Sequence, residues 1–409
     1  MLACFHQAGP MADESQSPAG VGTDRSTVHE DRLLTAPFVR LALADLAYFT
    51  AAGVAIYALP LYVTGPVGSN EAGAGLAFGA FAVSALVLRP FAGRLADRYG
   101  RRPLLVGGAL LCALAMLLTA AVSSLALVIV LRIVLGVAEA AFFVASLAAL
   151  ADLAPPSRMG EALSYNSLGL YLGLTAGPPL GELLVEGISL PAAWYGGAGL
   201  CVLAGVCAVW IGETRAPTRA ADEPVRLIHW KAIPPGLGFF ASIAAMGGFL
   251  AFSSLHAEDV GLTRTSLPLA AYGVVVVIGR IAFAKTADRF PPLPSGAAAL
   301  ATMGAGLTVS ALWTEPLGAV LGAAVLALGV TVSTPAFFRA VFATARPSER
   351  GAASGTASAF LDLGLGGGPI LLGLVAQSAG VPWAFAAGAG IAFAGGIWTL
   401  MLSRRRVAA

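Results

Sequence analysis

Charged side chains are scarce in this chain. Only 11% of its 409 residues are Asp, Glu, Lys or Arg, and 57% are hydrophobic, whereas an ordinary soluble domain has about 25% charged residues. So few charges cannot cover a surface that faces water, which excludes a soluble globular protein. The net charge is only +2, so nothing indicates a nucleic acid as a partner.

Cysteine and histidine are also rare, with four of each. Three of the cysteines fall in apolar segments, where we expect them to pack as small core residues rather than to form disulfides or bind a metal. The histidines, which we place in tails or loops and not inside a membrane span, are His6, His29, His229 and His256. The sequence has no Walker motif, zinc-ligand spacing or nucleophile elbow, which argues against ATP hydrolysis and covalent catalysis, and we expect no cofactor.

Long apolar runs recur along the whole chain. A helix of about 20 apolar residues crosses the roughly 30 Å of hydrocarbon in a membrane. Breaks rich in charge, proline or glycine separate twelve such runs, so we predict an all-helical membrane protein. The predicted spans are residues 36–63, 72–94, 103–122, 125–150, 160–184, 192–211, 233–255, 266–286, 295–313, 317–343, 351–377 and 382–402.

The positions of Lys and Arg predict the orientation of these spans. Cytoplasmic loops carry the excess of basic residues, and with both termini in the cytoplasm Arg264 is the one basic loop residue on the outside. We therefore expect a multi-pass protein of the cytoplasmic membrane. Its predicted parts are a disordered cytosolic tail (1–33), a six-helix bundle (34–212), a cytosolic linker (213–232), a second six-helix bundle (233–403) and a cytosolic tail (404–409).

The two predicted bundles are repeats of each other. One constant offset aligns Arg89 with Arg280, Tyr171 with Asp362, and the pair Gly177-Pro178 with a second Gly-Pro pair in the other bundle. Self-similarity of this kind indicates a repeated architecture. Parallel repeats related by an axis along the membrane normal place a substrate site between the halves near the midplane, reached as one half rocks against the other.

The segment after the second predicted span carries glycines, an acid and several arginines. It has the sequence Gly93-Arg94-Leu95-Ala96-Asp97-Arg98-Tyr99-Gly100-Arg101-Arg102-Pro103. It resembles the loop signature of the major facilitator superfamily, and Asp288-Arg289 resembles its degraded second copy. Gly93 would let two helix ends approach closely, and Asp97 can cap a helix or pair with the arginines. The resemblance implies a network that closes the cytosolic side in the outward-facing state; its residues are Gly93, Asp97, Arg98, Gly100, Arg101, Arg102, Asp288 and Arg289.

The fifth predicted span has a glycine at every fourth position along one stretch. The residues of this motif are Gly169, Gly173, Gly177, Pro178 and Gly181. The motif resembles the glycine-proline motif of the superfamily's drug and proton antiporters, which implies export. It departs from that motif at Glu182, where a second glycine is usual. The alternative explanation is a close helix contact with no bearing on direction of transport.

Three acids lie inside predicted spans: Asp45, Glu139 and Asp362. An isolated charge facing lipid is costly, so we expect Glu139, near the middle of its span, to face the central cavity. The resemblance implies that the first and fourth spans line that cavity, which adds Asp45 as a candidate. Arg132 lies two helical turns before Glu139 on the same helix face and resembles the superfamily arginine implicated in proton transfer. We therefore treat Asp45, Glu139 and Arg132 as proton-coupling candidates, with Asp362 next. The alternatives are a structural ion pair with another helix for Glu139, a cap or snorkelling group for Asp45 and a structural role for Asp362.

Taken together, the resemblance implies a secondary transporter that works by alternating access. We expect a proton-coupled exporter of a small drug-like, metabolite or sugar-like solute, and a proton-coupled symporter for nutrient uptake is the alternative. The expected partners are the solute, protons and membrane lipids, and the fold can work as a monomer. A mostly apolar cavity with few fixed charges favours an amphipathic, neutral or cationic solute over a multiply anionic one. An intramembrane enzyme or a passive channel is not supported by these residues.

Overall fold

The computed structural model describes residues 33–155, 158–214, 229–283, 290–346 and 350–407. Twelve long helices account for most of these residues, which confirms the predicted fold class. They are α1 (Ala36–Thr64), α2 (Glu71–Tyr99), α3 (Arg101–Thr119), α4 (Leu125–Leu153), α5 (Met159–Gly187), α6 (Leu190–Val209), α7 (Ile233–Asp259), α8 (Leu267–Phe283), α9 (Pro292–Leu312), α10 (Pro316–Phe342), α11 (Arg350–Ala379) and α12 (Val381–Val407).

Eleven helices in the described part of the chain are long and apolar enough to cross a membrane, and α8 is a shorter apolar helix. Local chemistry fixes many of their ends. The side chain of Asn70 accepts a hydrogen bond from the Gly73 amide at the start of α2, and Gly100 ends that helix with a φ of 101°. A positive φ of this kind is tolerated readily only by glycine, so α2 and α3 are joined through this one residue.

Three helices extend at least four residues beyond their predicted ends. The second predicted span ends at residue 94, but α2 continues to Tyr99 and takes most of the arginine-rich segment into the helix. Likewise α7 continues to Asp259, so His256 is a buried helix residue beside the ring of Phe385. Our placement of His256 in a loop was wrong, because no glycine or proline interrupts the helix before Gly261. The third, α12, runs on to Val407.

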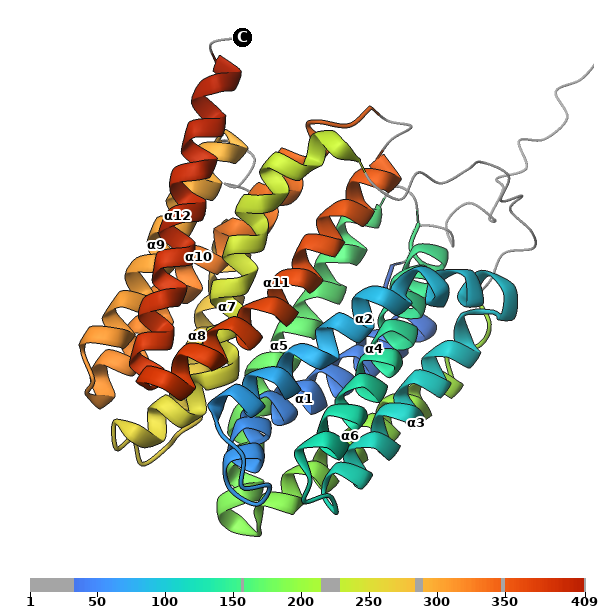
Figure 1. The fold of residues 1–409 in the computed structure, drawn as a ribbon. Helices are drawn as coiled ribbons and strands as arrows, with labels where there is room; N and C mark the ends of the chain where they lie inside the picture. The colour runs from blue at the N-terminus through green and yellow to red at the C-terminus, as the bar shows by residue number, and fades with distance from the viewer. Residues whose placement is uncertain (1–32, 156–157, 215–228, 284–289, 347–349, 408–409) are drawn as a thin grey trace, which may run out of the picture.

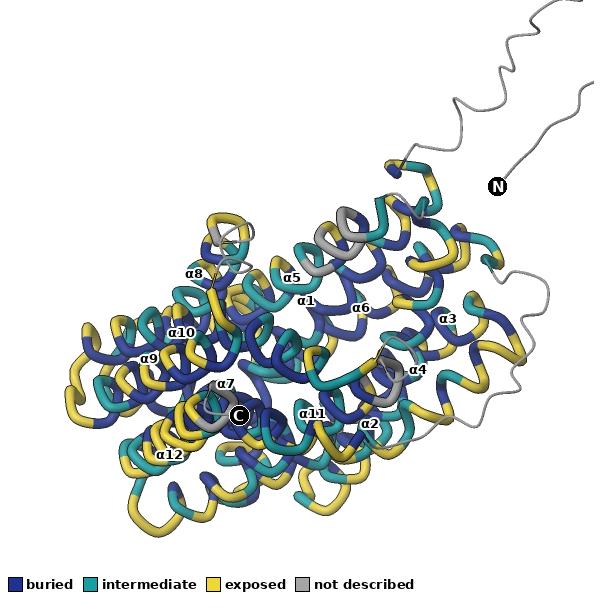
Figure 2. Tube along the Cα trace, turned by 90° about the horizontal axis from the view of Figure 1, so that it is seen from above, coloured by how far each residue is buried: buried dark blue, intermediate teal, exposed yellow. Residues whose placement is uncertain are grey.

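Each half packs in the same way. In the first half α1 contacts α5 and α6, α2 contacts α4, and α3 contacts α4 and α6; the second half repeats every one of these pairs from α7 to α12. Figure 1 shows the two six-helix bundles side by side, blue to green and yellow to red. The two largest contacts between the halves are α2 with α11 and α5 with α8, which Figure 2 shows at separate places along the interface; α7 also contacts α1 and α2.

Because the helices alternate in direction, the bundle has two distinct sides. We call the side where α1 begins and α12 ends the terminal side, and the other the opposite side. The connections α2 to α3 and α4 to α5 lie on the terminal side, and α1 to α2 and α7 to α8 lie on the opposite side.

Candidate functional site

Three charged side chains from three helices meet inside the bundle. The Nη2 atom of Arg89 in α2 lies 3.2 Å from Oε1 of Glu139 in α4 and 3.2 Å from Oδ1 of Asp362 in α11. The ring of Phe143 covers the guanidinium at 5.1 Å. We call Arg89, Glu139 and Asp362 the central charge cluster; it joins the first half of the protein to the second.

The two acids of the central charge cluster are buried, the Arg89 side chain is 20% exposed, and the cluster is incompletely hydrogen-bonded. The Asp362 side chain is 2% exposed and that of Glu139 is 10% exposed. The second carboxyl oxygens, Glu139 Oε2 and Asp362 Oδ2, are buried without a hydrogen-bond partner among the described residues, as is Nε of Arg89. Two carboxylates share one guanidinium, so the fully ionised cluster has one excess negative charge, and one added proton makes it neutral.

Small residues bring these three helices together. A Cβ atom at Gly136 of α4 would collide with Ser84 and with the carbonyl of Phe81 in α2, so the glycine permits the close approach that joins Arg89 to Glu139. Gly75 and Gly79 do the same for α2 against α11. Small residues at helix interfaces inside membranes allow this kind of packing. The cluster is therefore positioned by backbone contacts close to it.

Arg132 does not pair with Glu139, although the two lie along the same helix. Its Nε atom donates to the carbonyl of Ala77 at 3.2 Å, and its guanidinium carbon lies 4.9 Å from the centre of the Phe81 ring. Both contacts are to α2. The ion pair that Glu139 makes with Arg89 is instead a contact with another helix, the alternative that the sequence left open.

Asp45 is held apart from the cluster. It is 1% exposed in the interior of α1, and the Ser146 hydroxyl of α4 lies 2.8 Å from each of its carboxyl oxygens. A helix cap or a snorkelling group does not fit this position. Arg132, Glu139 and Ser146 follow one another at two-turn intervals, so they form a polar row along one face of α4.

The arginine-rich segment forms a network on the terminal side. Arg101 contacts Asp97 at 2.9 Å and Asp152 of α4 at 3.1 Å. The carboxylate of Glu213 accepts from the backbone amides of Arg101 and Arg102 at 2.8 and 3.3 Å, which suits a negative charge at the start of a helix. This network links α2, α3, α4 and the segment that follows α6, and the Asp97 side chain stays 75% exposed.

One detail of that segment differs from expectation. A Cβ atom at Gly93 would meet only Val144, at an ordinary 3.9 Å, so Gly93 does not mark a close helix approach in this conformation. Arg98 packs its guanidinium on the Tyr99 ring at 5.4 Å. Asp288 and Arg289, the second copy of the motif, lie outside the described residues.

The glycines of the antiporter-like motif line the face of α5 that packs on α1. A Cβ atom at Gly173 would lie 2.8 Å from the Thr50 amide, and one at Gly177 would lie 2.5 Å from the Cα atom of Gly53. Gly169 and Gly181 follow on the same face, and Pro178 also packs against Gly53. The second half repeats this contact between α7 and α11. The motif therefore serves the packing of α5 on α1, which is the alternative to a role in the direction of transport.

A second network, which the sequence did not predict, lies on the opposite side. Glu182 of α5 is 2% exposed and accepts hydrogen bonds from the Ser266 amide at 3.2 Å, the Ser266 hydroxyl at 2.7 Å and the Thr265 hydroxyl at 3.3 Å. Thr265 in turn bonds the hydroxyl of Tyr57 in α1 at 2.6 Å. We call Tyr57, Glu182, Thr265 and Ser266 the opposite-side latch, because it ties the two halves together. One sign of the opposite-side latch is visible in the sequence: Glu182 stands where the glycine-proline motif usually has a second glycine.

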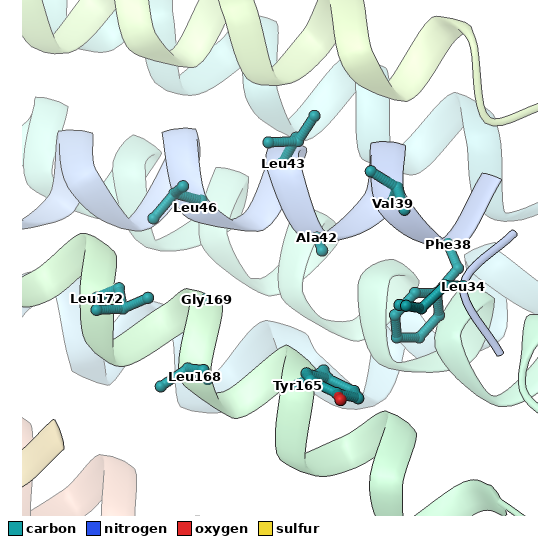
Figure 3. A pocket seen from close by; sticks show the side chains of 10 residues that line it. All are labelled: Leu34, Phe38, Val39, Ala42, Leu43, Leu46, Tyr165, Leu168, Gly169 and Leu172. Carbon is teal, nitrogen blue, oxygen red and sulfur yellow. The ribbon is translucent and has the colours of Figure 1, made fainter. Parts of the chain in front are cut away.

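A surface groove lies between α1 and α5 (Figure 3). Its walls are apolar apart from the Tyr165 hydroxyl, so it carries no group suited to proton coupling or to holding a charged solute. The lining residues are Leu34, Phe38, Val39, Ala42, Leu43, Leu46, Tyr165, Leu168, Gly169 and Leu172.

Known proteins resemble this chain over nearly its whole length. The family profile described as Major Facilitator Superfamily matches residues 41–341 and 236–409. An uncharacterized MFS-type transporter of Salmonella typhimurium is 27% identical over 90% of this chain and 96% of its own length. An uncharacterized MFS-type transporter of Burkholderia pseudomallei is 28% identical over 88% of this chain and 90% of its own length.

Solved structures share the fold. The human organic anion transporter MFSD10 (TETRAN) superposes with a TM-score of 0.67 at 18% identity, covering 89% of this chain and 99% of that one. A bacterial homolog of the human lysosomal transporter Spinster, in an inward-facing and occupied conformation, gives a TM-score of 0.74 at 15% identity, covering 90% of this chain and 96% of its own.

These findings define an integral membrane protein with many spans that acts as a secondary transporter and not as an enzyme. The chain belongs to the major facilitator superfamily.

Proposed function

We propose that this protein is a proton-coupled antiporter that exports a small drug-like, metabolite or sugar-like solute by alternating access. The observation that carries the proposal is the central charge cluster. One guanidinium serves two buried acids, and each acid keeps one buried oxygen without a hydrogen-bond partner among the described residues. Such an oxygen can hold a proton, which would also remove the excess charge of the cluster.

The cluster also links protonation to movement of the halves. Arg89 and Glu139 belong to the first half, and Asp362 belongs to the second. When Asp362 is ionised, its attraction to Arg89 holds α2 and α11 together at this level; when it is protonated, that attraction weakens. Rocking of one half against the other requires this contact to change. Proton uptake and release can therefore bias which side of the protein is closed.

We assign the terminal side to the cytoplasm, following the distribution of basic residues. The opposite-side latch then lies on the outside and holds it shut, so this conformation is the inward-facing one. The inward-facing Spinster homolog, whose fold this chain shares, supports the assignment. The exposed Asp97 and its partner Arg101 would engage the other half only after the cytosolic side closes, as the resemblance implies.

The two networks are expected to act in opposite directions on this equilibrium. Glu182→Gln replaces charged hydrogen bonds by weaker neutral ones, a loss of about 1 kcal/mol, which favours the outward-facing state about fivefold. Asp97→Asn is expected to favour the inward-facing state and to reduce transport at normal expression. The measurement is the distance between spin labels on cysteines placed at Pro66 and Thr263, in a background free of native cysteine. If Glu182→Gln leaves the distance distribution unchanged, the latch assignment is wrong.

Reconstituted protein tests the proposal as a whole. In proteoliposomes with an imposed pH gradient, screened over drug-like, metabolite and sugar-like solutes, we expect a solute to move against the direction of proton flow. One charge crossing 100 mV supplies about 2.3 kcal/mol and one pH unit about 1.36 kcal/mol, which together support a solute gradient of several hundredfold. Movement of solute and protons in the same direction would establish the symporter instead. Flux that does not respond to the proton gradient would refute proton coupling.

A further inference from the structure

A second arginine lies at the contact between α5 and α8, and none of the acids among the described residues pairs with it. The guanidinium carbon of Arg280 in α8 lies 4.1 Å from the centre of the Tyr171 ring in α5. Its Nε and Nη2 atoms are buried and make no hydrogen bond with any described residue. Arg280 belongs to the second half and Tyr171 to the first, so this contact spans the interface as the central charge cluster does.

The internal repeat shows what is missing around Arg280. The offset that aligns Arg89 with Arg280 also aligns Asp362 with Tyr171 and Glu139 with Val330. Both acids that neutralise Arg89 are thus replaced, one by a tyrosine and one by a valine, while the arginine itself is kept. The tyrosine ring faces the cation, but a ring supplies no hydrogen-bond acceptor for the guanidinium edge.

The two unpartnered nitrogens are suitably placed for one kind of ligand. Nε and Nη2 lie on the same edge of the planar guanidinium, the edge that binds the two oxygens of a carboxylate through parallel hydrogen bonds. A guanidinium with buried donors that make no hydrogen bond is destabilising. An anion that enters between α5 and α8 would supply both the missing charge and the missing acceptors.

We propose that Arg280 and Tyr171 form the binding site for a single carboxylate or sulfonate group of the transported solute, whose apolar body packs against the tyrosine. This assignment rests on the proposed function, since it names the class of solute that the transporter carries. It differs from the neutral or cationic solute expected from the sequence. Because the site has one residue from each half, its shape changes as the halves rock, which lets it bind on one side and release on the other.

Binding to the detergent-solubilised protein tests this site without any proton gradient. The probes are benzoate and benzenesulfonate, with benzamide as the uncharged match and dioleoyl phosphatidylglycerol as the lipid source of an anion. Thermal-shift titration is expected to show that both aromatic anions bind more tightly than benzamide. Arg280→Gln should weaken their binding between about 10-fold and 100-fold, and Arg280→Lys should weaken it less. Arg404→Gln, at an exposed position near the end of α12, is the control and should not weaken it.

Tyr171→Asp gives a second, independent test. It places a carboxylate where Asp362 stands in the other half, so it should pair with Arg280 and displace the anionic probes. Tyr171→Asn removes the same ring without adding a charge, so it should weaken binding of the probes less than Tyr171→Asp does. The site does not exist as proposed if benzamide binds as tightly as both anions, if the lipid alone binds, or if Arg280→Gln keeps wild-type affinity. These outcomes leave proton coupling untouched, since that is measured by gradient-driven flux and through Glu139.

Discussion

Glu139→Gln is expected to abolish solute movement driven by a proton gradient while leaving exchange of solute for solute intact. Glutamine has the same shape and can still accept a hydrogen bond from Arg89, but it cannot take up a proton at this position. The accumulated gradient should therefore fall from several hundredfold to about one, given the energy available from one proton. The measurement compares gradient-driven uptake with counterflow in the same proteoliposomes.

Two further variants make this result specific. Glu186→Gln removes an exposed acid near the end of α5 and should behave as wild type. Asp45→Asn should weaken the pH dependence of transport or change which solutes are accepted, because it alters the buried contact with Ser146 rather than the central charge cluster. Wild-type gradients in both Glu139→Gln and Asp45→Asn would exclude these acids as the coupling site and leave Asp362 as the next candidate. Proton release on addition of solute to the solubilised protein gives an independent check.

Arg89→Gln is expected to cause a large loss of stability. Removing the guanidinium leaves two carboxyl groups buried beside each other without their cation, and breaking a buried ion pair from one side costs about 3 to 5 kcal/mol. The second change Asp362→Asn should restore part of this loss, because it removes one of the two uncompensated acids. We expect a coupling energy of more than about 1 kcal/mol between the two positions, measured by a double-mutant cycle on thermal stability.

The surface pair of Asp97 and Arg101 provides the comparison for this cycle. The Asp97 side chain is 75% exposed, and exposed ion pairs contribute about 0 to 1 kcal/mol. Its coupling energy should therefore be smaller than that of Arg89 with Asp362. Equal coupling in the two cycles, or no rescue by Asp362→Asn, would mean that the central charge cluster does not hold α2 and α11 together.

The charged positions were found in the sequence more reliably than their partners. Glu139 was expected to avoid the lipid-facing surface because a charge there is costly, and it is buried, as are Asp45 and Asp362. In the sequence, Arg132 was the basic residue grouped with Glu139, because the two share a helix face. The structure pairs Glu139 with Arg89 instead, because the glycine contact at Gly136 brings α2 within reach of that face.

Helix count, helix order and the internal repeat are determined by the sequence itself, since the length of an apolar run and the spacing of breaks are local properties. The sequence also places Arg280 and Tyr171 at the positions of Arg89 and Asp362. Only the tertiary structure decides that one of these pairs is an ion pair and the other a cation on a ring, and that Glu182 joins the two halves. Such contacts depend on how far helices distant in the chain approach, and that distance is set by small residues packing against backbone, which no single segment encodes.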